Sequence, residues 1–225
     1  MSTPFRLTIG STGPVQQSPT TCGSACLTVA RMLVDPMFAS WIQTGQPVLP
    51  TSPAGETPAE RFAAYERIVM RRTNGLWILG RSVQPPWPRV LGTPPWGAKR
   101  ELELGAARFG ARYAVDQCRV GDRKGLVADY DRLVDVVADG EPGVLYVGNN
   151  YLPRHVVLVL PGHGDRALKV YEPASGTVRV LRRDEFAGHA LGLAGWDIPW
   201  ICVEPTGERA VRARGNLAAA TPTPA

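Results

Sequence analysis

The sequence lacks the segments that would direct a chain into or across a membrane. Residues 1–7 have no basic cap followed by an apolar core, so we predict no signal peptide. No apolar run approaches the roughly 20 residues of a membrane-spanning helix, so we predict no membrane span. The default expectation is a cytoplasmic protein. The alternative is export by a route that needs no cleavable signal.

Cysteine and histidine are also scarce. The four cysteines, Cys22, Cys26, Cys118 and Cys202, do not form a dense disulfide framework, which favours a reducing compartment. Together with the three histidines they show none of the paired spacings of a metal site. Glycine-rich loops of the kind that hold phosphate groups are absent as well. We therefore expect neither a metal nor a cofactor.

Basic residues are in excess but are not clustered. The net charge is +5 and the calculated pI is about 9.3, yet the arginines are scattered and only two doublets occur, at 71–72 and 182–183. A nucleic-acid-binding surface usually concentrates its basic residues in one patch or stripe. We therefore interpret the charge as a solvated basic surface and expect no nucleic-acid partner.

The hydrophobic pattern indicates a single domain. With 225 residues, 44% of them hydrophobic, the chain can bury a substantial core, which we place within residues 1–208. Residues 209–225 end in a low-complexity run of Ala, Thr and Pro, and we expect a disordered tail there. Helical patterns come first and strand patterns later, which predicts an α+β domain with an antiparallel sheet.

Turn residues and periodicity place the individual elements. A helix is predicted from Cys22 to about Val34, with Thr20 or Thr21 as its N-cap, and the five prolines within 36–58 predict loop or short turns. Further helices are predicted at about 59–72, 98–109 and 126–138, and strands at about 112–117, 144–148, 155–160, 168–172, 177–181 and 200–204.

One arrangement of residues suggests covalent chemistry. Gln16 precedes Cys22 by six residues, Cys22 begins the first predicted helix, His155 opens an apolar strand, and Glu172 closes the next strand. A thiol attacks best as a thiolate, which a helix N-terminus and a neighbouring imidazole both favour. This order of Gln, Cys, His and acid is what acyl transfer by a thiol requires.

These motifs resemble those of the papain-like cysteine peptidases, above all the peptidases that process bacteriocin leaders at a double glycine. The resemblance covers residues 14–35 and 126–205, whereas 36–98 looks like a divergent or inserted, proline-rich helical segment. It implies a papain-like fold, in which the helix that bears the nucleophile packs against an antiparallel sheet. It also implies a peptide or protein substrate, hydrolysed through a thioester acyl-enzyme.

The resemblance also implies a role for each residue. Cys22 would be the nucleophile and His155 the general base and later the acid, while Gln16 and the Cys22 backbone N–H would form the oxyanion hole. Glu172 stands where the family usually has Asp, and would orient the imidazole. Gln17 is the rival for the oxyanion role, because a register error of one residue would exchange it with Gln16.

Other readings of the same residues remain open. Asn149 or Asn150 could orient His155 instead of Glu172. The remaining histidines, His163 and His189, lie in predicted loops and are expected at the surface. Cys26, Cys118 and Cys202 are expected in the core.

Alternative functions are a thiol acyltransferase, a deamidase or toxin-like effector on the same fold, and a catalytically silent peptide-binding module.

Overall fold

A computed structural model describes residues 4–47, 52–75, 77–78, 82–83, 87–88, 91–162 and 167–209. The helices are α1 (Cys22–Val34), α2 (Pro36–Thr44), α3 (Pro58–Thr73), α4 (Pro95–Glu101), α5 (Arg123–Val137) and α6 (Arg183–Ala187), with a π-helical turn at Leu102–Ala106 after α4. The strands are β1 (Trp77–Ile78), β2 (Ser82–Val83), β3 (Ala111–Gln117), β4 (Gly143–Gly148), β5 (Pro153–Val159), β6 (Leu168–Glu172), β7 (Thr177–Leu181) and β8 (Ile198–Arg209).

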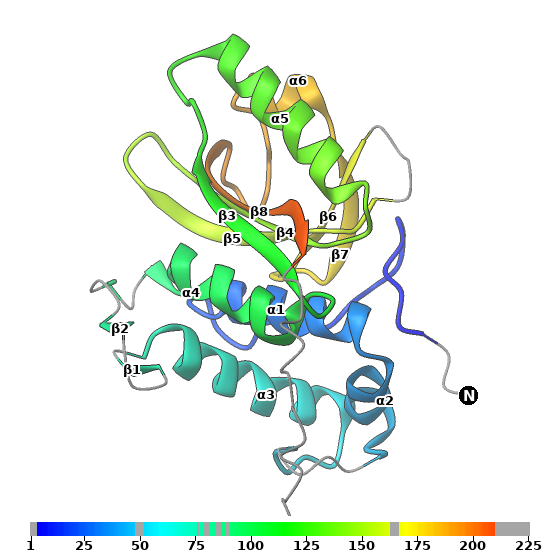
Figure 1. The fold of residues 1–225 in the computed structure, drawn as a ribbon. Helices are drawn as coiled ribbons and strands as arrows, with labels where there is room; N and C mark the ends of the chain where they lie inside the picture. Colours follow the sequence, from blue (N-terminus) through cyan, green and yellow to red (C-terminus); the bar gives the residue numbers. More distant parts are fainter. Residues whose placement is uncertain are drawn as a thin grey trace, which may run out of the picture.

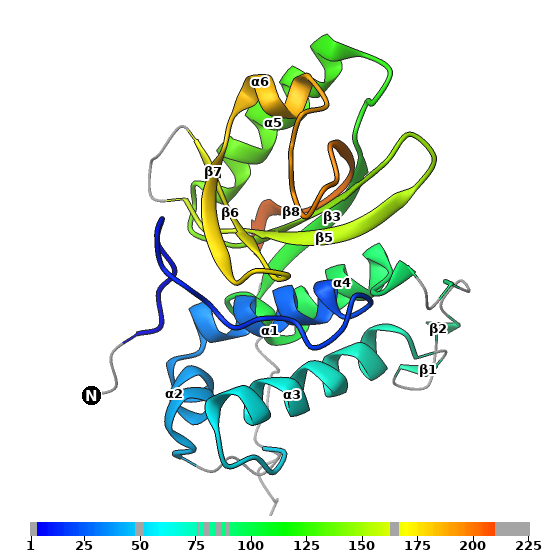
Figure 2. The ribbon, with the colours of Figure 1, turned by 180° about the vertical axis from the view of Figure 1, so that it is seen from behind.

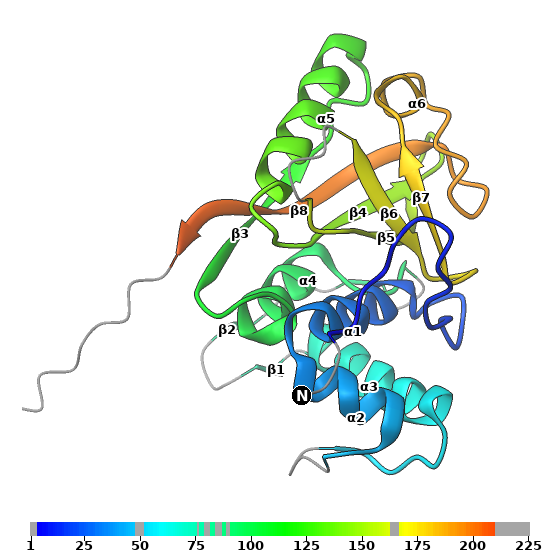
Figure 3. The ribbon, with the colours of Figure 1, turned by 90° about the vertical axis from the view of Figure 1, so that its right-hand side faces the viewer.

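A six-stranded antiparallel sheet forms the middle layer of the molecule, with the strand order β3-β8-β4-β5-β6-β7. Helices α1 to α4 lie on one side of the sheet, and α5 and α6 lie on the other (Figures 1 and 2). Figure 3 shows the same layers from the side. The predicted α+β class with an antiparallel sheet is therefore confirmed.

Alternation along the strands divides the core in two. Val144, Tyr146, Val156 and Leu158 belong to the cluster that includes α1, whereas their neighbours Leu145, Val147, Val157 and Val159 pack with α5 and α6. Successive side chains of a strand point to opposite faces, so a sheet covered on both sides needs apolar residues at nearly every position. The consequence is that α1 is enclosed between the sheet and α3 (Figure 2).

The proline-rich region contains a helix that the sequence analysis missed. We predicted loop or short turns over 36–58, but Pro36 begins α2. Asp35 caps this helix by accepting a hydrogen bond from the Phe38 N–H at 3.0 Å. Proline is tolerated at the first position of a helix because its missing N–H would have no helical partner there. Pro36 therefore ends α1 and starts α2.

Two other predicted boundaries need correction. The helix expected over 98–109 starts earlier, at Pro95, and gives way to the π-helical turn, in which Gly105 has a φ of 150°. Arg209, expected in the tail, is the last residue of β8, and the rest of the expected tail, 210–225, lies outside the described residues. Thr21 occupies the N-cap position of α1, but its side chain does not cap the helix.

Within the described ranges, no single helix is both long and apolar enough to cross a membrane. Helices α1 and α2 reach that length and hydropathy only as a pair bent by 115°.

Candidate active site

Cys22 is the first residue of α1. The Thr21 hydroxyl turns back to donate to the Ser18 carbonyl at 3.0 Å, so the first turn of the helix receives no side-chain cap. The first backbone hydrogen bond of the helix runs from the Ala25 N–H to the Thr21 carbonyl at 2.8 Å. The uncapped N–H groups and the positive end of the helix dipole therefore lie beside the Cys22 thiol, where they stabilise negative charge.

His155 and Glu172 meet on two adjacent strands. His155 lies in β5 and Glu172 ends β6, and the imidazole Nε2 is 2.6 Å from Glu172 Oε1. The same carboxylate oxygen accepts the Ala174 N–H at 3.0 Å, which fixes its position. Both side chains are buried, with 5% of His155 and 6% of Glu172 exposed. A charge-assisted contact of this kind is stronger than a neutral hydrogen bond.

The imidazole also contacts the Cys22 thiol. Burial lowers the pKa of His155, but hydrogen bonds with Cys22 and Glu172 outweigh it and raise the pKa to about 9. Because Nε2 is engaged by Glu172, Nδ1 is the ring nitrogen left for the thiol. At neutral pH the ring is therefore an imidazolium next to the sulfur, the partner that a thiolate needs.

Gln16 lies on the segment that leads into α1, and the sheet holds its backbone. The Gln16 N–H donates to the Pro173 carbonyl at 2.9 Å, directly after Glu172. The side-chain Nε2 donates to the Ser18 carbonyl at 2.9 Å. An amide NH₂ has two protons, so one remains for a substrate oxygen.

Gln17 is placed differently. Its exposed side chain points back to the Val15 carbonyl at 3.0 Å. The two side chains therefore bond in opposite directions along the chain, Gln16 toward the start of α1 and Gln17 away from it.

The structure brings Cys22, His155 and Glu172 together and assigns Asn149 another role. Asn149 Oδ1 accepts the backbone N–H groups of Tyr151 and Leu152 at 3.0 and 3.2 Å, so this side chain builds the β4–β5 turn. Its orientation toward His155, an alternative in the sequence analysis, is therefore not observed. Asn150 lines a cavity of about 330 Å³ together with His189 and Trp196.

The other cysteines occupy the core, as expected. The Cys26 thiol, one turn after Cys22, lies 3.5 Å from the Val156 carbonyl, and burial raises its pKa. Cys118 and Cys202 have their sulfur atoms 3.7 Å apart. Cys22 is itself only 2% exposed, so its environment and not its accessibility distinguishes it from the other thiols.

His189, expected at the surface, is half-buried and lines the cavity with Asn150, and His163 lies outside the described residues. The backbone of His189 has a φ of 55°; its Nε2 atom is buried and has no hydrogen-bond partner among the described residues.

Thr93 packs against the first turn of α1. A Cβ atom at Gly23 would lie 2.6 Å from the Cβ of Thr93, a distance that carbon atoms do not tolerate. The Thr93 carbonyl in turn accepts the Tyr146 hydroxyl at 2.9 Å. Only glycine at position 23 lets this segment approach α1 so closely, which explains the Cys22-Gly23 pair in structural terms.

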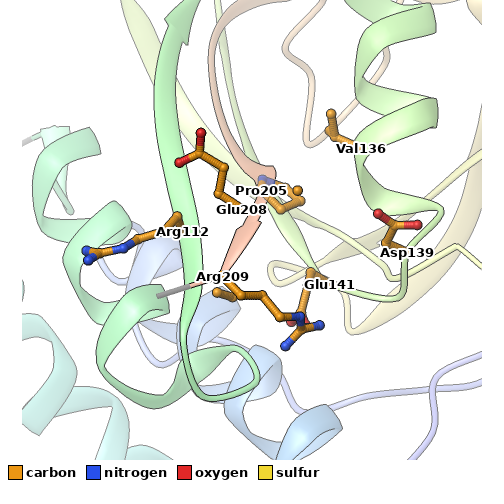
Figure 4. Close-up of a pocket in the computed structure, with 9 residues that line it drawn as sticks. Arg112, Val136, Asp139, Glu141, Pro205, Glu208 and Arg209 are labelled. Carbon is orange, nitrogen blue, oxygen red and sulfur yellow. The ribbon is translucent and has the colours of Figure 1, made fainter. Parts of the chain in front are cut away.

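A separate cavity lies at the far end of the β3–β8 pair and contains none of the four candidate residues. It has a volume of about 260 Å³ (Figure 4). Glu141 on its wall is buried and paired with Arg108 and Arg209 at 2.9 and 3.2 Å. The charges of Glu141 are therefore balanced within the protein, and this cavity offers no nucleophile.

Among the residues described, no three His, Cys, Asp or Glu side chains are grouped to hold a metal ion. The absence of a metal and of a cofactor stays a prediction. No model of a known protein family matches the chain, and no curated protein is significantly similar to it. The functional argument therefore depends on the geometry of the site.

Proposed function

We propose that the protein is a cysteine peptidase of papain-like type that cleaves a peptide or protein through a thioester at Cys22. The observation that carries the proposal is the buried chain of contacts from Cys22 through His155 to Glu172 at the N-terminus of α1. It joins a nucleophile, a base and an orienting acid, the three groups that covalent acyl transfer uses.

The proposed reaction has two steps. Cys22 Sγ attacks the substrate carbonyl, and the resulting oxyanion is stabilised by the Cys22 N–H and the Gln16 amide. His155 then gives its proton to the leaving amine as the C–N bond breaks, which leaves a thioester. In the second step His155 takes a proton from water, the hydroxide attacks the thioester, and the sulfur leaves as the thiolate. Glu172 keeps the imidazole in place throughout.

The test is cleavage of a diverse peptide library by the purified protein, with products identified by mass spectrometry. Cys22→Ala and His155→Ala should abolish cleavage. Cys26→Ala is the matched control, because Cys26 is a buried cysteine one turn away on the same helix, and it should retain cleavage.

Three other outcomes would contradict cleavage of peptide bonds. Products that form only when an amine acceptor is added would identify an acyltransferase. Conversion of glutamine to glutamate would identify a deamidase. Binding of peptides without any covalent Cys22 adduct would identify a silent binding module.

A further inference from the structure

Glu66 is a buried carboxylate that the proposed reaction does not use. It lies in α3, within the segment 36–98 that the family resemblance does not cover, and it has no exposed surface. An ionisable group is almost never fully buried without specific partners, because removing a charge from water is costly. Its hydrogen-bond partner therefore indicates why it is there.

The hydrogen-bond partner of Glu66 belongs to the segment that leads into α1. Glu66 Oε1 accepts the backbone N–H of Gln17 at 3.2 Å. Burial raises the pKa of Glu66, and its other oxygen, Oε2, is buried with no hydrogen-bond partner among the described residues. Gln17 directly follows Gln16, the proposed oxyanion donor, so the carboxylate holds the backbone next to that donor.

The opposite side of this segment is held by the sheet. The Gln16 N–H donates to the Pro173 carbonyl at 2.9 Å, and the Gly13 N–H donates to the Gly176 carbonyl at 2.7 Å. The Tyr171 hydroxyl bonds to the Pro14 carbonyl. The segment 13–21 is therefore fixed between the β6–β7 turn on one side and α3 on the other.

We propose that Glu66 is a positioning residue that sets the orientation of the Gln16 amide in the oxyanion hole. This inference rests on the proposed function. It gives the helical segment 36–98 a role in the chemistry, since α3 then supplies the support for the loop that carries this oxyanion donor. A hydrogen-bonded support of this type controls the placement of a donor to within fractions of an ångström, on which catalysis depends.

The test compares Glu66→Met, which fills a similar volume without an acceptor, with Glu66→Gln, whose side-chain oxygen can still accept the Gln17 N–H. The matched control is Glu101→Met. Glu101 is a buried carboxylate of the same helical layer that pairs with Arg72, away from the segment 13–21.

The first measurement is amide hydrogen exchange of Gln17 by NMR, which requires no substrate. We expect exchange at Gln17 to rise at least about tenfold in Glu66→Met and to stay near wild type in Glu66→Gln and Glu101→Met. Unchanged exchange in Glu66→Met would overturn the proposal. A rise of the same size in Glu101→Met would also overturn it, because the effect would then be general destabilisation.

The second measurement is turnover together with the rate of Cys22 alkylation. Glu66→Met should lower kcat about tenfold or more with little change in KM, and its rate of Cys22 alkylation should stay within about threefold of the wild-type rate. Glu66→Gln should keep most of the wild-type activity. The double variant of Glu66→Met and Gln16→Ala should have a kcat close to that of Gln16→Ala alone, since both changes impair the same donor. Losses that multiply in the double variant would refute the role of Glu66.

The two measurements separate this inference from the proposed function. If the wild-type protein hydrolyses nothing, the proposed function fails, and with it the oxyanion role of Gln16. The exchange result then still decides whether Glu66 holds the segment that leads to Cys22.

Discussion

Replacing Glu172 by glutamine tests the core of the site because it removes one charge and leaves the shape nearly unchanged. Glu172 Oε1 lies 2.6 Å from His155 Nε2 and also accepts the Ala174 N–H. A glutamine oxygen can make both contacts. Its NH₂ group would then take the place of Oε2, a buried atom without a partner among the described residues. The substitution thus removes the negative charge and adds an unsatisfied buried donor.

The expected magnitude follows from the strength of the lost interaction. A hydrogen bond to a charged group contributes about 1.5–3 kcal/mol, and one pKa unit corresponds to about 1.4 kcal/mol. Glu172→Gln should therefore lower the pKa of His155 by about one to two units from its raised value of about 9. At pH 7 about a tenth to a half of the imidazole would lose its proton, which by itself lowers turnover at most about twofold. If the same interaction is also lost from the transition state, its free energy of about 1.4–2.8 kcal/mol lowers turnover about tenfold to a hundredfold.

The direct assay is an NMR titration of the protein with isotope-labelled histidine. The chain has only three histidines, so the signals can be assigned. The midpoint of His155 should lie near pH 9 in the wild type and clearly lower in Glu172→Gln. Asn149→Asp is a useful control, because it places a charge in the β4–β5 turn without touching the Glu172 contact. Equal midpoints in wild type and Glu172→Gln would refute the role assigned to the carboxylate.

The same interaction predicts a pH dependence of stability. The pKa of His155 is higher in the folded protein than the usual value of 6.5, so the folded state binds this proton more tightly than the unfolded state does. The stabilisation is complete below about pH 6.5 and is lost as the pH rises through about 9. Denaturant unfolding at pH 6 and pH 9.5 should show a smaller difference for Glu172→Gln than for the wild type.

Four further outcomes are expected. Iodoacetamide should modify Cys22 before the other three cysteines near neutral pH, because His155 stabilises its thiolate, whereas burial raises the pKa of Cys26, and the contact with Cys118 together with burial raises the pKa of Cys202. Peptide mapping that finds Cys118 modified first would contradict this. Gln16→Ala should reduce turnover about a hundredfold and leave Cys22 alkylation largely intact, and a silent Gln16→Ala beside a damaging Gln17→Ala would move the donor by one residue. Gly23→Ala should lower the free energy of unfolding, measured with denaturant, by about 1–3 kcal/mol, because the new Cβ would collide with Thr93. An unchanged unfolding midpoint would show that Thr93 moves aside without loss of stability. Glu172→Asp should give His155 a pKa between those of the wild type and Glu172→Gln. A higher His155 pKa in Glu172→Gln than in Glu172→Asp would show that the close contact matters more than the negative charge.

The elements with strong periodicity were predictable from the sequence, and the reason is visible in their packing. Helix α1 occupies the predicted range because its apolar face is buried against the sheet, and the five strands from β4 to β8 lie where apolar runs are bounded by turn residues. Helix α2 was missed because proline was taken only as a breaker. The capping bond from Asp35 that makes Pro36 a helix start depends on geometry that a count of prolines does not reveal.

The residues of the candidate site also differ in how far the sequence predicts them. Cys22, His155 and Glu172 stand at element ends that the sequence marks, so their proximity could be predicted. The position of Glu66 could not be predicted, because no motif or spacing connects it to Gln17, and only the packing of α3 beside α1 brings the two together. The approach of Thr93 to Gly23 could likewise not be predicted, since Thr93 belongs to a distant segment.

The length of the acid at position 172 decides how it reaches the imidazole. Glu172 is the last residue of β6, and its side chain contacts His155 of the neighbouring strand β5 at 2.6 Å. An aspartate at this position would be one methylene short and its contact would open from 2.6 Å to about 4 Å. Because Coulomb attraction falls as the inverse of distance, it would keep about two thirds of the attraction, whereas glutamine keeps the contact and loses the charge. The expected order of His155 pKa values, Glu above Asp above Gln, follows from this geometry.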